Sequence, residues 1–287
     1  MKQFKYSLAL ILALAFSASS LAGCAAGGKP AASPGVRTVT YAFSSVGKPA
    51  SYIDANGNMT GYDVEVMRAI DALLPQYEFE IVGTTSEDCW MGTESGKYQV
   101  CTTNSFRTEA REKTYLFAEY NQGGNLEGII VRNENAGVET LADLAASGLR
   151  VTPFRPSDGP YGFISAYNDA HPDNQIVLST ADQMENADLL RSVGEGRYDA
   201  TIFASTYWQS MVVDEDAELH YLNDQLTFNA FDAISTWALF NKDEAELRDA
   251  YQAALLQLRE NGTLSALSNQ FFGVDVLSFC NEYIPAK

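Results

Sequence analysis

Two arginines lie close together in a chain that is otherwise strongly acidic. Arg107 and Arg111 follow Asn104 and precede a short aromatic run. A guanidinium is planar and can make two parallel charge-assisted hydrogen bonds to a carboxylate, so this segment could hold the acidic group of a small molecule. The alternative is an ordinary charged helix, in which Arg111 forms a surface ion pair with Glu112 or Glu119 that contributes about 0–1 kcal/mol.

Residues for other kinds of chemistry are few. The chain has two histidines, His171 and His220, and its cysteines are scattered, so no set of metal ligands is recognisable and we predict neither a metal site nor a cofactor. Glu127 and Asp232 are conceivable as an acid or a base, but no motif of acid–base or nucleophilic catalysis surrounds them. These residues favour a binding protein over an enzyme.

The elements that must position the arginine segment alternate between strands and helices. Apolar residues recur at helical spacing in some stretches, and apolar and polar residues alternate in others. This alternation predicts an α/β fold with mostly parallel sheets flanked by helices, and its restart near residue 126 predicts two lobes. The predicted strands cover 36–43, 77–82, 98–102, 126–132, a segment from 151, 175–178 and 198–203; the predicted helices lie around 66–74, 87–94, 140–146, 159–171, 184–193, 247–258 and 263–272, with Thr140 and Thr263 as caps.

The place of the arginine segment in this pattern points to ligand binding. In open α/β sheets, ligands bind at the carboxyl ends of strands, where loops meet helix N-termini. The arginines follow the third predicted strand, so they lie where a ligand-holding side chain is expected. Two lobes of this kind that face each other form a cleft.

Composition narrows the class of protein. The chain has 287 residues, enough for one large domain or two smaller ones, and 46% of them are hydrophobic. It has 37 acidic and 19 basic residues, and its formal net charge is −18. Such a surface repels phosphate backbones, so we expect no binding to nucleic acid.

The first residues have the features of an export signal. Lys2 and Lys5 precede an apolar stretch over 6–16, which is too short to span a bilayer comfortably. The stretch ends in LAGC, which resembles the bacterial lipobox, and this resemblance implies that a signal peptide of residues 1–23 is removed and that Cys24 is lipidated. The alternative is an ordinary signal peptide with an incidental cysteine. Residues 24–35 are rich in Ala, Gly and Pro and predict a flexible tether between a membrane anchor and an extracytoplasmic body.

Three further cysteines remain in the body. An exported protein can hold a disulfide, and Cys89, Cys101 and Cys280 allow three different pairs with one thiol left over. The spacing does not choose among these pairs. A disulfide of Cys280 could fix the end of the chain to the first lobe.

Five segments occur in the order seen in one known family. They are NGNMTGYDVE at 56–65, SGKY at 95–98, TEAR at 108–111 followed by YLF at 115–117, GRYDA at 196–200 and NGTL at 261–264. Together they resemble the bacterial family 3 solute-binding proteins, the amino-acid receptors of ABC importers, over residues 36–276. The resemblance implies a type II periplasmic-binding-protein fold with a two-strand hinge: 36–124 plus 236–276 as lobe 1, 125–235 as lobe 2, and a C-terminal extension over 277–287.

The resemblance also implies contacts of lobe 1 with the ligand. The arginine of the family's TxxR segment binds the α-carboxylate of the ligand, and Arg111 stands at that position, whereas Arg107 falls at a variable position and is expected to be solvated. Asn104 matches a polar contact at the strand end. Phe106 stands where many members have Ser or Thr, and implies an apolar wall and a different ligand shape. Tyr52 or Phe43 could supply an aromatic wall, although core packing is the alternative for each.

Lobe 2 departs further from the family. The family's helix-opening segment corresponds to residues 156–159, where Ser157 and the helix start could receive a carboxylate. Asp158 would oppose an anion there, and it could equally serve as an N-cap. The family's aspartate for the α-ammonium is replaced by Ala204. A buried ammonium needs a partner, so Asp232 is the expected substitute, with Asp158 next, unless the ligand lacks an ammonium group.

These observations predict a lipid-anchored, monomeric receptor whose two lobes close on a small polar solute, such as an amino acid or a derivative. The receptor would present the solute to the permease and ATPase of an ABC importer. One alternative is an enzyme on the same scaffold, of the dehydratase or cell-wall lyase type. Another is a ligand sensor that acts through a separate signalling chain.

Overall fold

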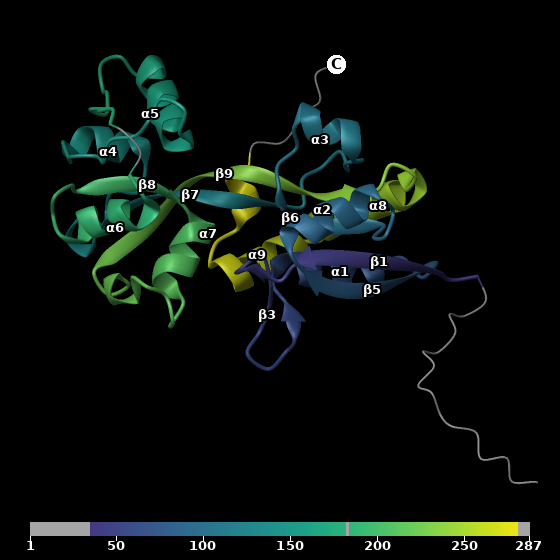
Figure 1. Ribbon diagram of the computed structural model, residues 1–287. Coiled ribbons are helices and arrows are strands. Elements are labelled where there is room, and N and C mark those ends of the chain that lie inside the picture. The colour runs from purple at the N-terminus through teal and green to yellow at the C-terminus, as the bar shows by residue number, and fades with distance from the viewer. Residues whose placement is uncertain (1–34, 182–183, 281–287) are drawn as a thin grey trace, which may run out of the picture.

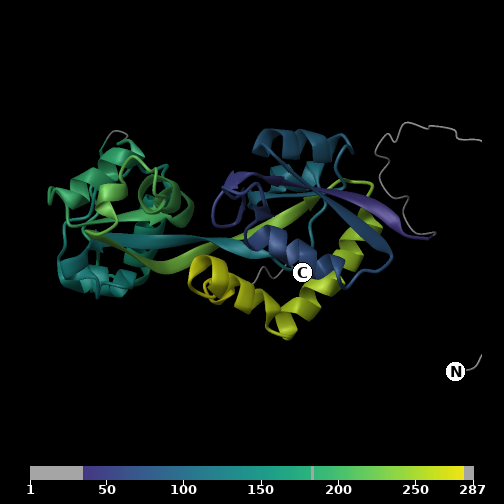
Figure 2. The same ribbon diagram turned by 90° about the horizontal axis from the view of Figure 1, so that it is seen from below.

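The structure, a computed structural model, describes residues 35–181 and 184–280 (Figure 1). It consists of two lobes at opposite ends of two long strands, β7 (Gly123–Arg132) and β9 (Leu226–Phe240), which we call the crossing strands (Figures 1 and 2). The expected signal peptide, Cys24, most of the tether and the last residues of the expected extension lie outside the described residues. Within the described ranges, no helix has the length and apolar character needed to cross a membrane.

Lobe 1 contains the parallel strands of the sheet. The order across the sheet is β5-β1-β6-β9-β7-β8, with β1 parallel to β5 and β6, and β9 antiparallel to β6. A small second sheet, β2-β3-β4, lies beside it. The elements of lobe 1 are β1 (Arg37–Ser44), β2 (Val46–Gly47), β3 (Ser51–Ile53), β4 (Met59–Thr60), α1 (Tyr62–Asp71), β5 (Tyr77–Thr84), α2 (Ser86–Glu94), β6 (Val100–Ser105), α3 (Glu109–Thr114), α8 (Ala245–Glu260) and α9 (Thr263–Phe272).

Both faces of the lobe 1 sheet are covered, as the continuous burial of β1 requires. Tyr41 and Phe43 point into a core built with α1, α8 and α9, whereas Ala42 points to the opposite face, into a cluster with α2. Phe43 is fully buried in the first of these cores, so the structure assigns it to core packing and not to a ligand wall.

Lobe 2 has its own core, which draws on residues 129–226. Its ladder is antiparallel, β9-β7-β8. Val151 joins it through an isolated parallel bridge to Ala200 of β8, and Phe154 forms an isolated parallel bridge with Thr180 outside the ladder. The elements are η1 (Asn133–Asn135), α4 (Leu141–Ser147), α5 (Gly159–Ala170), α6 (Asn186–Gly194), β8 (Ala200–Ala204), α7 (Ser205–Trp208), η2 (Gln209–Val213) and η3 (His220–Leu222), and η4 (Val276–Ser278) follows α9 near the crossing strands.

The fold class is confirmed: this is a two-lobed α/β protein of the expected type. The expected mostly parallel sheet is found in lobe 1, whereas the ladder of lobe 2 is antiparallel. Two predicted strands are wrong in detail. Residues 175–178 form no strand, because only Ile176 of that run is buried and Val177 is 83% exposed. The strand predicted from residue 151 is reduced to bridges, since Pro153 has no N–H to donate.

The crossing strands pair with each other along their whole shared length, from Gly123 opposite Thr236 to Arg132 opposite Leu226. The register shifts once, because Glu127 pairs with Asp232 whereas Gly128 pairs with Ala230. The unpaired residue, Phe231, is therefore a β-bulge, a feature that bends a strand and changes the direction of its side chains.

A buried polar network holds the start of β7 against lobe 1. Gln122 Nε2 donates a hydrogen bond of 2.6 Å to Asp63 Oδ1, and Tyr62 Oη donates one of 2.8 Å to the Gln122 carbonyl. Tyr251 Oη donates to Gln122 Oε1 from α8. Asp63 is only 5% exposed, so one end of the crossing strand is tied to the interior of lobe 1.

The three cysteines of the body are free thiols. Cys89 and Cys101 are fully buried and belong to one cluster between α2 and β6. Cys280 lies elsewhere. Its backbone forms an isolated parallel β-bridge with Ala233 of β9, and its thiol donates a hydrogen bond to the Gly123 carbonyl at 3.6 Å. The end of the described chain therefore contacts the crossing strands through packing and hydrogen bonds, and the suggested disulfide to lobe 1 is absent.

Candidate ligand-binding site

Arg111 lies in the first turn of α3, which is capped by Thr108. Its Nη1 donates a hydrogen bond of 2.9 Å to the Phe106 carbonyl, and its guanidinium carbon lies 5.6 Å from the ring centroid of Trp90. Trp90 is itself held by a hydrogen bond of 2.8 Å to Thr103. Among the described residues, no carboxylate pairs with Arg111, so the surface ion pair considered from the sequence does not form in this structure.

Arg107, and not Arg111, forms the ion pair with Glu112 that was considered for Arg111 from the sequence. Its Nε lies 2.5 Å from Glu112 Oε1, and its guanidinium carbon lies 5.6 Å from the Phe117 ring centroid. The side chain is 19% exposed. The expectation that Arg107 is solvated is therefore wrong, because the planar guanidinium packs against an aromatic ring while its charge is paired.

A cleft of 770 Å³ lies between the lobes. It brings together three of the expected residues of lobe 1, Tyr52, Asn104 and Phe106, and lobe 2 contributes residues that include Ala204 and Tyr207. Asn104 adopts φ 53°, in the left-handed region, where the strand leaves the sheet. The cleft is within the usual size range of small-molecule sites, about 300–1,000 Å³.

One ion pair connects the two lobes beside this cleft. Lys48 Nζ of lobe 1 lies 3.2 Å from Asp214 Oδ1 of lobe 2, and both residues line the cleft. The lysine side chain is 46% exposed. An exposed pair of this kind contributes about 0–1 kcal/mol, so it restrains the relative position of the lobes only weakly.

A smaller hollow of 270 Å³ adjoins the cleft within lobe 2 and contains Asp158. Asp158 Oδ1 accepts a hydrogen bond of 2.9 Å from Arg155 Nη2, and this pairing lowers the pKa of the carboxyl. Asp158 occupies the N-cap position of α5 but makes no side-chain cap hydrogen bond. Ser157 is exposed and lines neither cavity.

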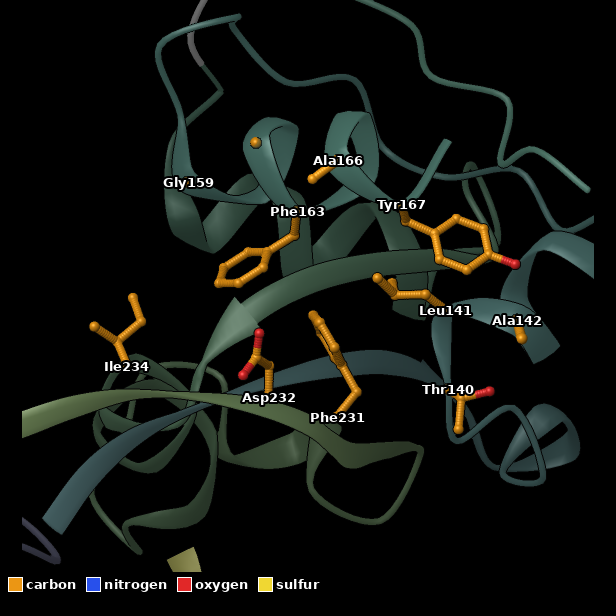
Figure 3. Close-up of a pocket in the computed structure, with 11 residues that line it drawn as sticks. Thr140, Leu141, Ala142, Gly159, Phe163, Ala166, Tyr167, Phe231, Asp232 and Ile234 are labelled. Atoms are coloured by element: carbon orange, nitrogen blue, oxygen red, sulfur yellow. The ribbon is translucent and has the colours of Figure 1, made fainter. Parts of the chain in front are cut away.

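Asp232 lies in a different hollow. This groove of 840 Å³ is formed by α4, α5 and β9, and Figure 3 shows the Asp232 carboxylate beside Phe231 and below Phe163. The two phenylalanine rings meet edge to face at 5.6 Å. Asp232 Oδ1 accepts a hydrogen bond of 2.7 Å from the Ala233 N–H. The structure therefore does not bring Asp232 into the cleft with Tyr52, Asn104 and Phe106.

Glu127, unlike Asp232, does line the cleft. Ala204, Glu127 and Asp232 stand opposite one another on β8, β7 and β9, so their side chains share one face of the sheet. Glu127 is 6% exposed and lines both the cleft and the smaller hollow. Burial, and secondarily the charge of Asp232, raise the pKa of Glu127 to about 7.

From the sequence, Glu127 is expected only as a conceivable acid or base and not as a ligand contact. A signal was nevertheless present, because this glutamate stands alone within an apolar strand, LEGIIV. An ionisable residue inside such a strand must be paired or serve a site. In the described parts of the chain, no group of three His, Cys, Asp or Glu side chains is arranged to hold a metal ion.

Known proteins share this sequence pattern and fold. The profile of the bacterial extracellular solute-binding proteins, family 3, matches residues 39–274. The L-cystine-binding protein TcyJ of Bacillus subtilis is 29% identical over 225 residues, which are 78% of this chain and 80% of TcyJ. A membrane-bound lytic murein transglycosylase F of Pseudomonas fluorescens is 31% identical, but over only 39% of this chain and 22% of that enzyme.

Among solved structures, the L-cystine solute receptor of Neisseria gonorrhoeae in its unliganded open conformation has a TM-score of 0.62 and 22% identity, over 83% of this chain and 94% of the receptor. That likeness concerns the fold. The family profile spans both lobes and the crossing strands, including the segments that line the cleft. This chain belongs to the bacterial extracellular solute-binding proteins, family 3.

Proposed function

We propose that this protein is the receptor of an ABC importer for an amino acid, with L-cystine as the first candidate. As a family 3 member it is an extracytoplasmic solute-binding protein. The similarity to TcyJ supports the choice of solute. The partial match to a transglycosylase covers too little of either chain to favour an enzyme.

One observation carries the proposal: Arg111 is a held guanidinium without an acidic partner. Among the arginines in the described ranges, only Arg111 and Arg259 lack a carboxylate, and Arg259 instead donates to Asn121. Arg111 is fixed by Trp90 and by the carbonyl of Phe106, a residue that lines the cleft. Its remaining N–H groups suit the α-carboxylate of an amino acid.

The other expected residues have roles consistent with this orientation. Asn104 would supply polar contacts at the end of β6, and Tyr52 and Phe106 would supply the apolar walls that amino-acid side chains need. Ser157 and Asp158 have no assigned contact, because Ser157 is exposed and Asp158 is paired with Arg155. Residues 36–124 plus 236–276 and residues 125–235 would move as the two lobes that close on the solute.

A thermal-shift screen tests the proposal. The mature protein is heated with each of the twenty amino acids and with L-cystine, and Arg111→Gln is compared with Arg107→Gln. A ligand at 100 times its Kd stabilises the folded state by about 2.7 kcal/mol. We expect one of these compounds to stabilise the wild type and Arg107→Gln but not Arg111→Gln. Equal stabilisation of both variants would contradict the role of Arg111.

The proposal includes attachment to the membrane through a lipid on Cys24, with the protein acting as a monomer beside its permease and ATPase. The support is the LAGC sequence that follows the apolar stretch of residues 6–16. Cell fractionation tests this point: wild-type protein should sediment with membranes, and Cys24→Ala should be released. Release of both proteins would argue for an ordinary signal peptide.

A further inference from the structure

Glu127 is an enclosed carboxylate with no donor bound to it. Its side chain is 6% exposed, and it lines the cleft between the lobes as well as the hollow inside lobe 2. From the residues that the structure describes, no hydrogen bond or ion pair reaches its carboxylate. Buried carboxylates in proteins are normally paired, so an unpaired one that faces a cavity points to a missing cation.

The surrounding charges do not supply that cation. Of the basic groups that line the two cavities with Glu127, Lys48 is paired with Asp214, and Arg155 is paired with Asp158. The remaining titratable groups of these cavities are acidic or phenolic: Asp216, Tyr52 and Tyr207. On the next strand, Asp232 adds a further negative charge.

We propose that Glu127 binds the ammonium group of the solute and so makes a positive charge on the solute a condition of binding. This inference rests on the proposed function of the cleft as an amino-acid site. An ionised carboxylate without a partner is unfavourable in an enclosed site, and an ammonium group that enters the cleft removes this penalty by pairing with it. Recognition of the solute then uses two opposite charges, Arg111 for the carboxylate and Glu127 for the ammonium.

The position of Glu127 explains how the site works without an acid on β8. Ala204 stands directly opposite Glu127 on the neighbouring strand and has no functional group, so the glutamate side chain has free access to the space beside it. Asp232 is on the other neighbouring strand, but its carboxylate accepts from the Ala233 N–H and lies in the groove of α4 and α5. Glu127 and Ala204 line both cavities, and of these two only Glu127 has an ionisable side chain.

Isothermal titration calorimetry with a defined panel tests the proposal. The panel contains the twenty amino acids, L-cystine, putrescine as an amine without a carboxylate, and 3,3′-dithiodipropionate as cystine without its ammonium groups. We expect Glu127→Gln to weaken the Kd of the bound amino acid about 30-fold or more. Asp232→Asn, the matched acid-to-amide change in the same row, should alter the Kd far less. Glu127→Gln should fold with an unchanged or higher Tm at pH 8, since it removes a buried charge.

The outcomes separate this inference from the proposed function. If Glu127→Gln leaves the Kd unchanged, or 3,3′-dithiodipropionate binds as tightly as L-cystine, the role of Glu127 is wrong while the receptor function stands. If putrescine alone binds and loses affinity in Glu127→Gln, the role of Glu127 stands while the amino-acid function fails. If no ammonium-bearing compound binds the wild type, both are wrong.

The pH dependence of binding gives a second readout. Because the pKa of Glu127 is about 7 in the ligand-free protein, an ammonium ligand must displace a proton at lower pH. The affinity should therefore fall about tenfold per pH unit below 7 and become constant above pH 8. Glu127→Gln should remove this slope, whereas Asp232→Asn should keep it. A slope that persists in Glu127→Gln would overturn the assignment.

Discussion

Asp63 and Glu127 are both buried carboxylates, but among the described residues only Asp63 has a hydrogen-bond donor. Gln122 donates to Asp63 at 2.6 Å, yet burial still raises the pKa of Asp63 to about 7, since the hydrogen bonds from Gln122 and Thr102 offset only part of the effect of burial. Asp63 therefore serves the fold, by fixing the start of β7, whereas Glu127 remains free to serve a ligand.

The raised pKa of Asp63 predicts how stability depends on pH. An aspartate has a pKa of about 3.9 when unfolded, so the folded protein binds the proton of Asp63 more tightly. The stabilisation from this proton is fully present in acid and is lost as the pH rises through 7. We expect the free energy of unfolding of Asp63→Asn, relative to wild type, to rise by about 2–3 kcal/mol between pH 5 and pH 8.

Urea unfolding of both proteins at several pH values measures this difference. The amide introduced by Asp63→Asn keeps an oxygen that can accept from Gln122, so the comparison isolates the charge. The tyrosines around this network stay protonated in the same range, because burial raises the pKa values of Tyr41 and Tyr251 well above 10. A difference between the two proteins that is independent of pH would show that Asp63 does not titrate as described.

At the scale of elements, local patterns predicted most of the fold. The capping position of Thr140 is confirmed by a capping box with Asp143, and Thr263 begins α9, although Gly262 holds the cap position itself. The long helices were predictable because their apolar stripes recur at helical spacing. The run at 175–178 was not, because a short apolar run does not reveal whether a partner strand is available.

The candidate site was predictable only in part, because some of its residues are brought together by pairing between strands that are distant in the sequence. Asn104 and Phe106 follow one strand, and Tyr52 lies on a nearby short strand, so lobe 1 of the site was foreseen. Glu127 and Asp232 depend on the register between β7 and β9 and on the bulge at Phe231. Register is a non-local property, and no segment of sequence states which residue on one strand faces which residue on another.

At the scale of the whole molecule, two lobes are joined by the crossing strands, and both lobes line the cleft between them. Of the residues assigned to the solute, Tyr52, Asn104, Phe106 and Glu127 line the cleft, and the cleft shares Glu127 and Tyr207 with the hollow of lobe 2. Arg111 lines neither cavity and reaches the cleft only through its hydrogen bond to the Phe106 carbonyl. A solute held by Arg111 of lobe 1 and Glu127 of the crossing strand β7 would stabilise an arrangement in which the lobes approach each other.

Small-angle X-ray scattering measures this approach. We expect the radius of gyration of the wild-type protein to fall when the amino acid found in the screen is added to saturation. Arg111→Gln at the same ligand concentration should keep the radius of the free protein, and Arg107→Gln should contract like the wild type. Binding without contraction would indicate a rigid receptor and would remove lobe closure from the mechanism.

The position of β9 also has a consequence for how the chain is made. In the order β5-β1-β6-β9-β7-β8, β9 supplies the pairing partner of both β6 and β7, yet it is the last of these six strands to be synthesised. A nascent chain that ends before residue 226 therefore lacks the strand that joins β6 to β7 in the six-stranded sheet, and α8 and α9, which close the core of lobe 1, come later still. We therefore expect lobe 1 to reach its final fold only after β9, α8 and α9 have all been synthesised.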